Sequence, residues 1–336
     1  MCKVKIGING FGRIGRQLTK LVLNSSSVEL VAINDLADSK TSAHLFKYDT
    51  SYGIFNGNVE YKDSEIIING NSIKKFAERD PSQINWTDHE VDIVVESTGI
   101  FTKKVQAEKH ISGSVKKVII SAPATDEDIT IVLGVNEENY DPKNHNVISN
   151  ASCTTNCVAP MVKVLNENFS IKHALMSTIH SFTNDQSVLD QPHSDLRRSR
   201  TASENIIPTS TGAAKAVVQV IPEMKGKIDG MAYRVPTASV SVTDLTVSLN
   251  KNTTSEEINS VFESSSKNEL KGFLEYSDLP LVSQDFKGNP HSVIFDSLST
   301  IQVENNFFKI VGWYDNEWGY ANRTFNLIEM VSSKLT

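Results

Sequence analysis

The sequence predicts two successive domains: a doubly wound α/β domain around a parallel sheet, then an α+β domain whose sheet is mostly antiparallel. Over the first 150 residues, strand-like and helix-like segments alternate, which is typical of a parallel sheet with helices on its faces. After Asn150, alternating apolar and polar runs indicate antiparallel strands. We expect a first domain over residues 1–152, joined by a C-terminal helix over 317–336, and a second domain over 153–316.

The composition of the 336 residues is that of an ordinary globular protein, with 39% hydrophobic and 22% charged residues. A net charge of −7 argues against nucleic acid or an anionic membrane as partner. The chain shows no apolar signal segment and no run long enough to span a bilayer. Three cysteines make no disulfide framework, which favours a reducing compartment. We expect a cytoplasmic protein.

Hydrophobic patterns set the elements expected in the first domain. A polar, β-rich insertion interrupts the alternation and resembles a hairpin more than a crossover. The expected elements are strands Val4–Asn9, Val28–Asn34, Val91–Glu96 and Lys117–Ser121, helices Ile14–Asn24 and Thr102–His110, and the insertion Gly53–Lys74.

The second domain combines fewer helices with longer alternating strands. Its polar segment Ser181–Asn205 is long for a structureless loop, which indicates function or a subunit interface. The expected elements are a helix after Ser152, a strand Ala174–Ile179, a helix Gly212–Ile221, strands within Ala238–Asn250, Ser292–Ser297 and Phe307–Tyr314, and a final helix Tyr320–Leu335.

A glycine-rich turn stands between the first strand and the first helix and reads Gly10-Phe11-Gly12-Arg13-Ile14-Gly15. Gly10 permits a tight turn, Gly12 lets a pyrophosphate approach the backbone, and Gly15 allows close helix–strand packing. Asp35 ends the second strand, where a carboxylate accepts both ribose hydroxyls and repels a 2′-phosphate. The alternative is a structural turn in another α/β fold. The strand, the helix and the acidic residue all stand where the dinucleotide motif requires them. This agreement favours a Rossmann-like domain that binds NAD rather than NADP.

Cys153 opens the segment Cys153-Thr154-Thr155-Asn156-Cys157, and apolar residues at helical spacing follow it. A helix N-terminus favours a thiolate, and His180, at the end of a strand-like run, is a candidate base. The alternative is that Cys153 is a buried small residue, as most free cysteines are. Cys157 lies one helical turn later and is expected to face the core. No Cys/His cluster with ligand spacing accompanies the pair, so we expect no metal site.

These motifs together resemble the phosphorylating glyceraldehyde-3-phosphate dehydrogenases of the bacterial type. The resemblance covers nearly the whole chain and is carried by Lys3–Gly15, Ser152–Cys157, Asn205–Pro208, Thr211–Val217, Arg234–Thr237 and Trp313–Tyr320.

The resemblance implies NAD-dependent oxidation of D-glyceraldehyde 3-phosphate to 1,3-bisphosphoglycerate, a step of glycolysis. Cys153 would attack the aldehyde, and His180 would activate the thiol and act as base. The resulting thioester would be split by inorganic phosphate. Such an intermediate keeps the acyl group activated, and covalent catalysis divides one hard step into two easier ones. The resemblance also implies a homotetramer.

The resemblance further implies binding residues for two anions and for the cofactor. Most runs of arginines lie on solvated loops, and this alternative applies most to Arg197 and Arg200. The implied residues are Thr183, Arg198 and Arg234 for the substrate phosphate, Ser152, Thr154, Thr211 and Gly212 for inorganic phosphate, and Arg79, Thr98, Ser121, Asn316 and Tyr320 for NAD, with Asn316 on the carboxamide.

One position departs from the pattern: Gln191 stands where many NAD-specific members carry leucine, so the choice of NAD over NADP is in question. Two alternatives also remain. A paralogue acting on erythrose 4-phosphate would share the thiol, the histidine and the nucleotide site. A non-enzymatic NAD-binding or adhesion protein would share the fold, because fold does not imply function.

Overall fold

The computed structural model describes residues 3–335, whose contacts divide the chain into two compact units. Unit 1 takes in the chain up to Ile131, Glu138–Ala151 and the segment from Ala321 onward, and unit 2 comprises Val132–Glu137 and Ser152–Tyr320. The domain limits given above stay a prediction. No helix among residues 3–335 is long and apolar enough to cross a membrane.

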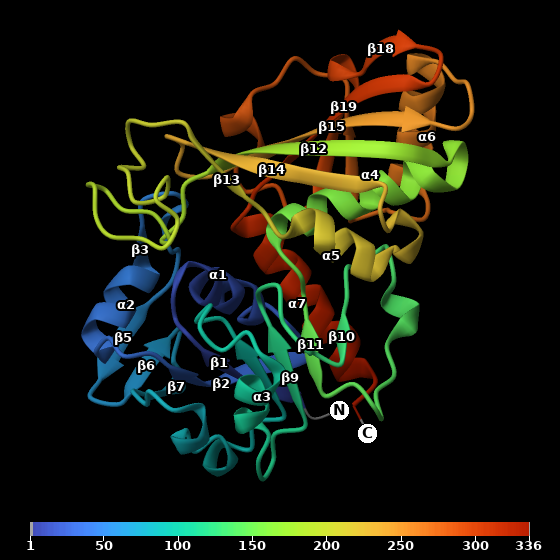
Figure 1. Ribbon diagram of the computed structural model, residues 1–336. Helices are drawn as coiled ribbons and strands as arrows, with labels where there is room; N and C mark the ends of the chain where they lie inside the picture. Colours follow the sequence, from blue (N-terminus) through green and yellow to red (C-terminus); the bar gives the residue numbers. More distant parts are fainter. Residues whose placement is uncertain (1–2, 336) are drawn as a thin grey trace. The chain divides into compact units, whose positions relative to one another are not determined.

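Unit 1 is built on a nine-stranded sheet in the order β10-β11-β9-β8-β1-β2-β7-β6-β5 (Figure 1). Neighbours from β10 to β7 pair in parallel, whereas β7, β6 and β5 form an antiparallel edge. The strands are β1 (Val4–Asn9), β2 (Val28–Asn34), β5 (Val59–Lys62), β6 (Glu65–Ile68), β7 (Asn71–Phe76), β8 (Ile93–Glu96), β9 (Lys117–Ile120), β10 (Ile129–Thr130) and β11 (Val147–Ser149).

The strand order reverses at β1, which lies between β2 and β8, and this is the switch point at which doubly wound sheets bind ligands. The central strands are buried on both faces and are mostly apolar, as in β8, whose four residues are all buried and of which only the last, Glu96, is polar. The helices of this unit are α1 (Arg13–Val22), α2 (Ser39–Lys47), α3 (Lys104–Ala107) and most of α7 (Trp318–Ser333), and a small ribbon pairs β3 (Tyr48–Asp49) with β4 (Gly53–Ile54).

Unit 2 holds an eight-stranded sheet in which β13-β14-β12-β15-β19-β17-β16 lie side by side and β18 pairs with β19. Only β12–β14 and β16–β17 pair in parallel, so the sheet is mostly antiparallel. The strands are β12 (Ile171–Ser181), β13 (Ile207–Ser210), β14 (Ile228–Val235), β15 (Ser241–Leu249), β16 (Leu274–Ser277), β17 (Val293–Asp296), β18 (Ile301–Glu304) and β19 (Phe307–Tyr314).

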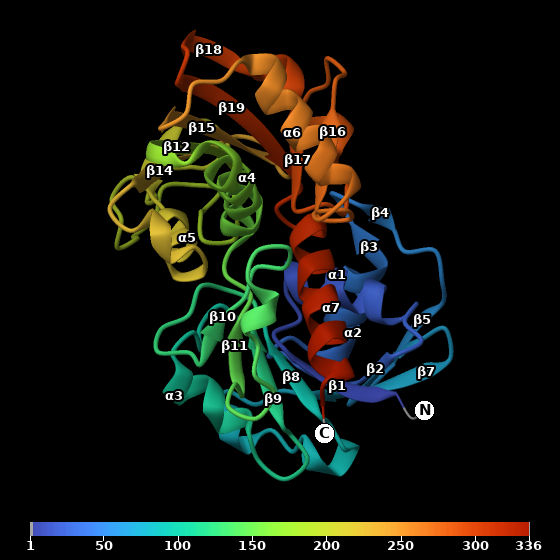
Figure 2. The same cartoon turned by 90° about the vertical axis from the view of Figure 1, so that its right-hand side faces the viewer.

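Three helices pack against this second sheet: α4 (Cys153–Phe169), α5 (Ala213–Val220) and α6 (Ser255–Lys267) (Figure 2). Helix α4 contacts β12, β15, β17 and β19, and it also packs against both other helices. Most of its residues are buried, among them Val158, Met161 and Val162, so the helix is enclosed on most of its surface. The first turn of α4 is thereby fixed against the sheet.

The predicted fold class is confirmed: a parallel-dominated sheet comes first and a mostly antiparallel one second. Strands Val4–Asn9, Val28–Asn34 and Phe307–Tyr314 have the predicted bounds, and the insertion forms the β5–β6–β7 edge. The predicted helix Thr102–His110 is wrong in extent. It is one α-helical turn, α3, followed by a 3-10 turn over Glu108–His110.

Candidate active site

Cys153 is the first residue of α4, and His180 is the penultimate residue of β12. Ser152 caps the helix, because its Oγ accepts the backbone N–H of Thr155 at 3.0 Å. The Sγ of Cys153 lies 3.4 Å from Nε2 of His180, within hydrogen-bond reach for sulfur. Strand β12 and the capped helix therefore bring a thiol and a ring nitrogen into direct contact.

The second ring nitrogen of His180 also has partners. Its Nδ1 lies 2.6 Å from the carbonyl oxygen of Ser181 and 2.8 Å from Nη1 of Arg234, the residue opposite His180 in the β12–β14 register. Burial, and then the charge of Arg234, lower the pKa of His180 to about 3. The ring is therefore neutral at neutral pH. When Nδ1–H donates to the carbonyl of Ser181, Nη1 of Arg234 donates to that same oxygen, at 3.0 Å, and not to Nδ1, and Nε2 faces Cys153 as an acceptor.

The environment of Cys153 differs from the sequence-based expectation. Burial raises the pKa of this thiol, although the charge of Arg234 and hydrogen bonds from Thr154 lower it. The predicted lowering by the helix N-terminus is therefore outweighed by desolvation. In this structure Cys153 and His180 form a neutral thiol–imidazole pair, so activation of sulfur requires that His180 take the proton as the sulfur attacks.

Two arginines flank this pair in different ways. Among residues 3–335, Nε of Arg234 is buried and has no hydrogen-bond partner, so this guanidinium retains a donor that an anion would satisfy. Arg198, in contrast, is held by the chain: its Nε donates to Thr209 at 2.9 Å, and its Nη1 pairs with Asp185. The charge of Arg198 also lowers the pKa of His180. Both cations thus act on one region of unit 2.

The other predicted phosphate residues lie on adjoining elements. Thr183 follows β12 directly, and Gly212 is the residue before α5. No atom lies within 4 Å of the place where a side chain on Gly212 would point. The Thr211 hydroxyl accepts the N–H of Ala213 at 3.2 Å. Among the described residues, contacts at hydrogen-bond distance join Cys153, His180 and Arg234, and no hydrogen bond connects Thr183 or Thr211 to this trio.

Sequence reasoning missed Tyr314, a buried residue at the end of β19. Its hydroxyl lies 2.9 Å from Oγ1 of Thr154 and 2.8 Å from Oγ1 of Thr178, and its ring centroid is 5.9 Å from that of His180. Tyr314 belongs to the same quoted segment as Asn316, which was the available signal. It links the first turn of α4 to β12, and so fixes the distance between thiol and histidine.

Ser241 was also missed, and it orients Asn316. The hydroxyl of Ser241 accepts the N–H of Ser181 at 3.1 Å and donates to Oδ1 of Asn316 at 3.0 Å. The amide of Asn316 is thereby tied to the end of the strand that carries His180. Tyr320, which the resemblance also assigns to the cofactor, is buried in the first turn of α7.

The predicted cofactor residues of unit 1 share one position in the fold, the carboxyl edge of the parallel sheet. Each follows a different strand in the contiguous order β9-β8-β1-β2-β7, around the switch point. Ser121 follows β9, Thr98 follows β8, Gly10 follows β1, Asp35 follows β2 and Arg79 follows β7.

The glycine turn has the geometry that a dinucleotide needs. Gly10 has φ +97°, and a side chain there would meet the Ser97–Thr98 backbone at 2.7 Å. At Gly12, by contrast, no atom lies within 4 Å of the side-chain position, so a phosphate can approach the start of α1 closely. These residues fit the pyrophosphate of a dinucleotide.

Two carboxylates hold this turn in place. Asp35 accepts the N–H of Phe11 at 2.8 Å and that of Ala37 at 2.9 Å, so this carboxylate fixes the turn. Arg13, at the start of α1, pairs with the buried Asp49 at 3.0 Å. Its guanidinium is thus part of the scaffold, while its backbone lies in the helix's first turn.

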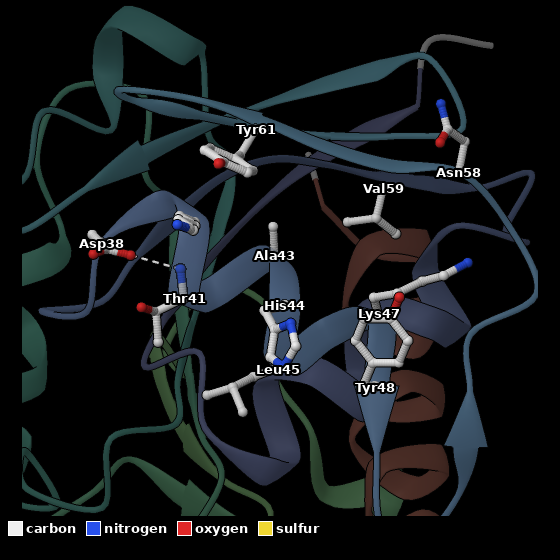
Figure 3. Close-up of a pocket in the computed structure, with 11 residues that line it drawn as sticks. Asp38, Thr41, Ala43, His44, Leu45, Lys47, Tyr48, Asn58, Val59 and Tyr61 are labelled. Atoms are coloured by element: carbon white, nitrogen blue, oxygen red, sulfur yellow. Dashed lines mark hydrogen bonds between the residues drawn. The ribbon is translucent and has the colours of Figure 1, made fainter.

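Other features of the described residues contribute nothing to this chemistry. Cys157 is fully buried, and burial raises its pKa to about 12. No group of three or more His, Cys, Asp or Glu side chains within residues 3–335 is placed to hold a metal ion. A surface cavity of about 600 Å³ lies beside α2 and β5 and is lined in part by His44, Tyr48 and Tyr61 (Figure 3). It contains none of the predicted site residues.

Comparison with known proteins assigns both units to one family. The model of the NAD binding domain of glyceraldehyde 3-phosphate dehydrogenase matches residues 4–104, and that of its C-terminal domain matches residues 152–316. The chain is 61% identical to glyceraldehyde-3-phosphate dehydrogenase 1 of Bacillus cereus, over 98% of this chain and 99% of the relative. It is 56% identical to glyceraldehyde-3-phosphate dehydrogenase 2 of Streptomyces avermitilis and 54% identical to the enzyme of Geobacillus stearothermophilus, with at least 98% of each chain covered. The chain therefore belongs to the glyceraldehyde-3-phosphate dehydrogenase family and is an NAD-dependent oxidoreductase.

Proposed function

We propose that this protein oxidises D-glyceraldehyde 3-phosphate with NAD and inorganic phosphate to 1,3-bisphosphoglycerate, and that Cys153 is the nucleophile. The observation that carries the proposal is the 3.4 Å contact between Sγ of Cys153 and Nε2 of a neutral His180. The names of the full-length relatives support this substrate over erythrose 4-phosphate. A binding or adhesion protein without activity would have no need of a thiol paired with a base.

In the first half of the reaction, Sγ of Cys153 attacks the aldehyde carbon while Nε2 of His180 takes the thiol proton. His180 passes that proton to the carbonyl oxygen, which becomes the hydroxyl of a thiohemiacetal. Bound NAD supplies the hydride acceptor for the oxidation. His180 takes back the hydroxyl proton as the acyl group becomes a thioester on Cys153.

In the second half, inorganic phosphate attacks the thioester and the sulfur of Cys153 leaves. The carbon–sulfur bond breaks as the carbon–oxygen bond of the acyl phosphate forms, and His180 returns its proton to the sulfur. We propose that Arg234, through its unpartnered Nε, binds an anion in this region, and that Arg198 adds charge to it. Thr183, Ser152, Thr154, Thr211 and Gly212 complete the two anion pockets in this proposal.

We propose that the cofactor lies along the switch-point edge of unit 1. Gly12 through Gly15 would contact the pyrophosphate, and Asp35 would contact a ribose. Thr98 and Ser121 would contact the part of NAD that lies beyond this ribose. In unit 2, Asn316 would hold the carboxamide, and Ser241 keeps its amide in a single orientation. The open space at Gly12 supports this assignment.

We also propose a homotetramer in a reducing, cytoplasmic compartment. The segment from Phe182 to Ile206 forms no helix or strand and exposes four large apolar side chains, each at least 69% accessible: Val188, Leu189, Leu196 and Ile206. Large apolar side chains exposed on an irregular segment support an interface there. Light scattering would report about four chains, and an active monomer would contradict the proposal.

One assay tests the function itself. Formation of NADH from glyceraldehyde 3-phosphate is expected to require both NAD and inorganic phosphate. A rate that is the same without phosphate, or a preference for erythrose 4-phosphate, would overturn the proposed reaction.

A further inference from the structure

Beneath the switch-point edge of unit 1 lies a row of buried polar side chains that the proposed mechanism does not use. Asn34, Asn9 and Glu96 are the last residues of β2, β1 and β8, and they are directly opposite one another in register. None is more than 4% exposed. Three buried polar residues side by side in a sheet core need partners, because each unpaired group would cost free energy.

One chain of hydrogen bonds begins at Glu78, in the segment that follows β7, and runs to Asn34. The backbone N–H of Glu78 donates to Oδ1 of Asn34 at 2.8 Å, and Nδ2 of Asn34 donates to the carbonyl oxygen of Glu78 at 2.9 Å. These backbone partners fix the orientation of the Asn34 amide. Its Nδ2 also donates to Oδ1 of Asn9 at 2.7 Å, and Nδ2 of Asn9 then donates to Oε2 of Glu96 at 2.5 Å.

A second chain enters from the opposite side. The indole N–H of Trp86, which can only donate, points at Nδ1 of His110 at 3.1 Å. The proton of His110 is therefore on Nε2, which lies 3.0 Å from Oε2 of Glu96. The other oxygen of Glu96 accepts both the N–H of Thr98, at 2.9 Å, and the Thr98 hydroxyl.

Both chains of hydrogen bonds and the two donors of Thr98 thus end at Glu96, a side chain that only accepts. The network also ends at the loops assigned to the cofactor. Thr98 is bound directly, whereas Gly10, Asp35 and Arg79 each follow a member of the chain, namely Asn9, Asn34 and Glu78. A single carboxylate therefore ties together four loops from four adjacent strands.

We propose that Glu96 is a positioning residue for NAD, which holds the four switch-point loops in the conformation that binds the dinucleotide before it arrives. His110 and Trp86 complete the network from below. This inference rests on the proposed NAD-dependent function. With the carboxylate in place, the ordering of these loops is achieved on folding, so binding of NAD does not bear that cost.

Glu96→Gln is the sharpest test, because glutamine keeps the shape but must donate from one of the two oxygen positions. Either position already faces two donors, so a hydrogen bond is lost either from Thr98 or from Asn9, the residue before Gly10. We expect the dissociation constant for NAD, measured by calorimetry, to rise about tenfold or more. The KM for NAD should rise in parallel, while kcat at saturating NAD and the KM for glyceraldehyde 3-phosphate stay near the parent values.

Asp128→Asn is the matched control for a general loss of stability. Asp128 is another carboxylate of unit 1 that gathers several donors, from Lys104 and from the backbone of Asn146 and Val147, away from the cofactor loops. We expect Asp128→Asn to lower the melting temperature without weakening the binding of NAD. The proposal is wrong if the two variants lose the same stability and the same affinity for NAD. It is also wrong if folded Glu96→Gln binds NAD with a dissociation constant within twofold of the parent value.

A second pair of variants decides the question if Glu96→Gln does not fold. His110→Gln can still accept from Trp86 and donate to Glu96, whereas His110→Leu can do neither. We expect His110→Gln to bind NAD nearly as the parent does and His110→Leu to bind it several-fold more weakly. Equal affinities in the two variants would contradict the proposal. A parent protein that does not bind NAD at all would instead refute the proposed function.

Discussion

Sγ of Cys153 lies 3.4 Å from Nε2 of His180, although the two residues are separated by a full helix and most of a strand. The contact exists because helix α4, which begins at Cys153, packs against β12 and β19. Tyr314 connects them, with hydroxyl contacts to Thr154 on the helix and Thr178 on the strand. Helix and sheet thus fix one distance on which the chemistry depends.

The two cysteines of α4 provide a test of this assignment. Cys153→Ala should abolish dehydrogenase activity and leave NAD binding intact, because the thiol is the proposed nucleophile. Cys157→Ala should keep substantial activity, since Cys157 packs fully buried in the core. A stoichiometric thiol reagent should label Cys153 first, because burial raises the pKa of Cys157 to about 12. Equal losses of activity in the two variants would contradict the assignment.

The local parts of this site could be predicted from the sequence. The glycine turn, the strand before it and the acid after the second strand lie within 35 residues, and each depends on neighbouring positions only. The capped start of α4 is local in the same sense, because Ser152, Cys153 and the apolar helix positions are adjacent.

The remaining parts depend on pairings that no local pattern encodes. Arg234 contacts His180 because β14 pairs in parallel with β12, and the sequence analysis did not recognise β14 as a strand. The pKa of Cys153 was predicted from the helix N-terminus alone, whereas burial by distant elements decides its direction. Glu96 lies at the end of a predicted strand, but its three partner residues, Asn9, Thr98 and His110, include one that is 87 residues away in the sequence.

Burial of His180 in a neutral form should make the protein sensitive to acid. Its pKa falls from 6.5 in the unfolded chain to about 3 in the folded one, so below pH 6.5 the unfolded state binds a proton that the folded state does not. Stability is therefore lost as pH falls from 6.5 to 3, by up to about 1.4 kcal/mol per pH unit. His180→Asn should reduce that slope in urea titrations at several pH values. If the free energy of unfolding falls with pH equally in parent and variant, His180 does not cause the loss of stability in acid.

Arg234 should matter mainly for binding of the phosphorylated substrate. Arg234→Leu removes a charged donor, which typically costs about 1.5–3 kcal/mol, so the KM for glyceraldehyde 3-phosphate should rise on the order of tenfold to a hundredfold. Arg200→Leu is the matched control, because Arg200 forms an exposed ion pair with Asp190. This variant should leave the KM for glyceraldehyde 3-phosphate unchanged. If the parent enzyme used unphosphorylated glyceraldehyde equally well, the pocket would be wrongly assigned.

The choice between NAD and NADP tests Asp35 and Gln191 together. Asp35 stands at the end of β2, where its negative charge repels a 2′-phosphate, so NAD should be the preferred cofactor of the parent enzyme. Asp35→Asn should reduce the preference, measured as the ratio of kcat/KM for the two cofactors. The amide keeps only one oxygen for the N–H groups of Phe11 and Ala37, so some loss of NAD affinity should accompany the change.

Gln191 belongs to the irregular segment after β12, where its side chain bonds to the hydroxyl of Ser187. Gln191→Leu restores the residue that many NAD-specific members carry, and it removes a polar group that an extra phosphate could contact. We expect this variant to raise the NAD-to-NADP ratio of kcat/KM above that of the parent, without changing the KM for glyceraldehyde 3-phosphate. If NADP is the better cofactor of the parent, the side chains around Gln191 outweigh the charge of Asp35, and the role given to that carboxylate is wrong.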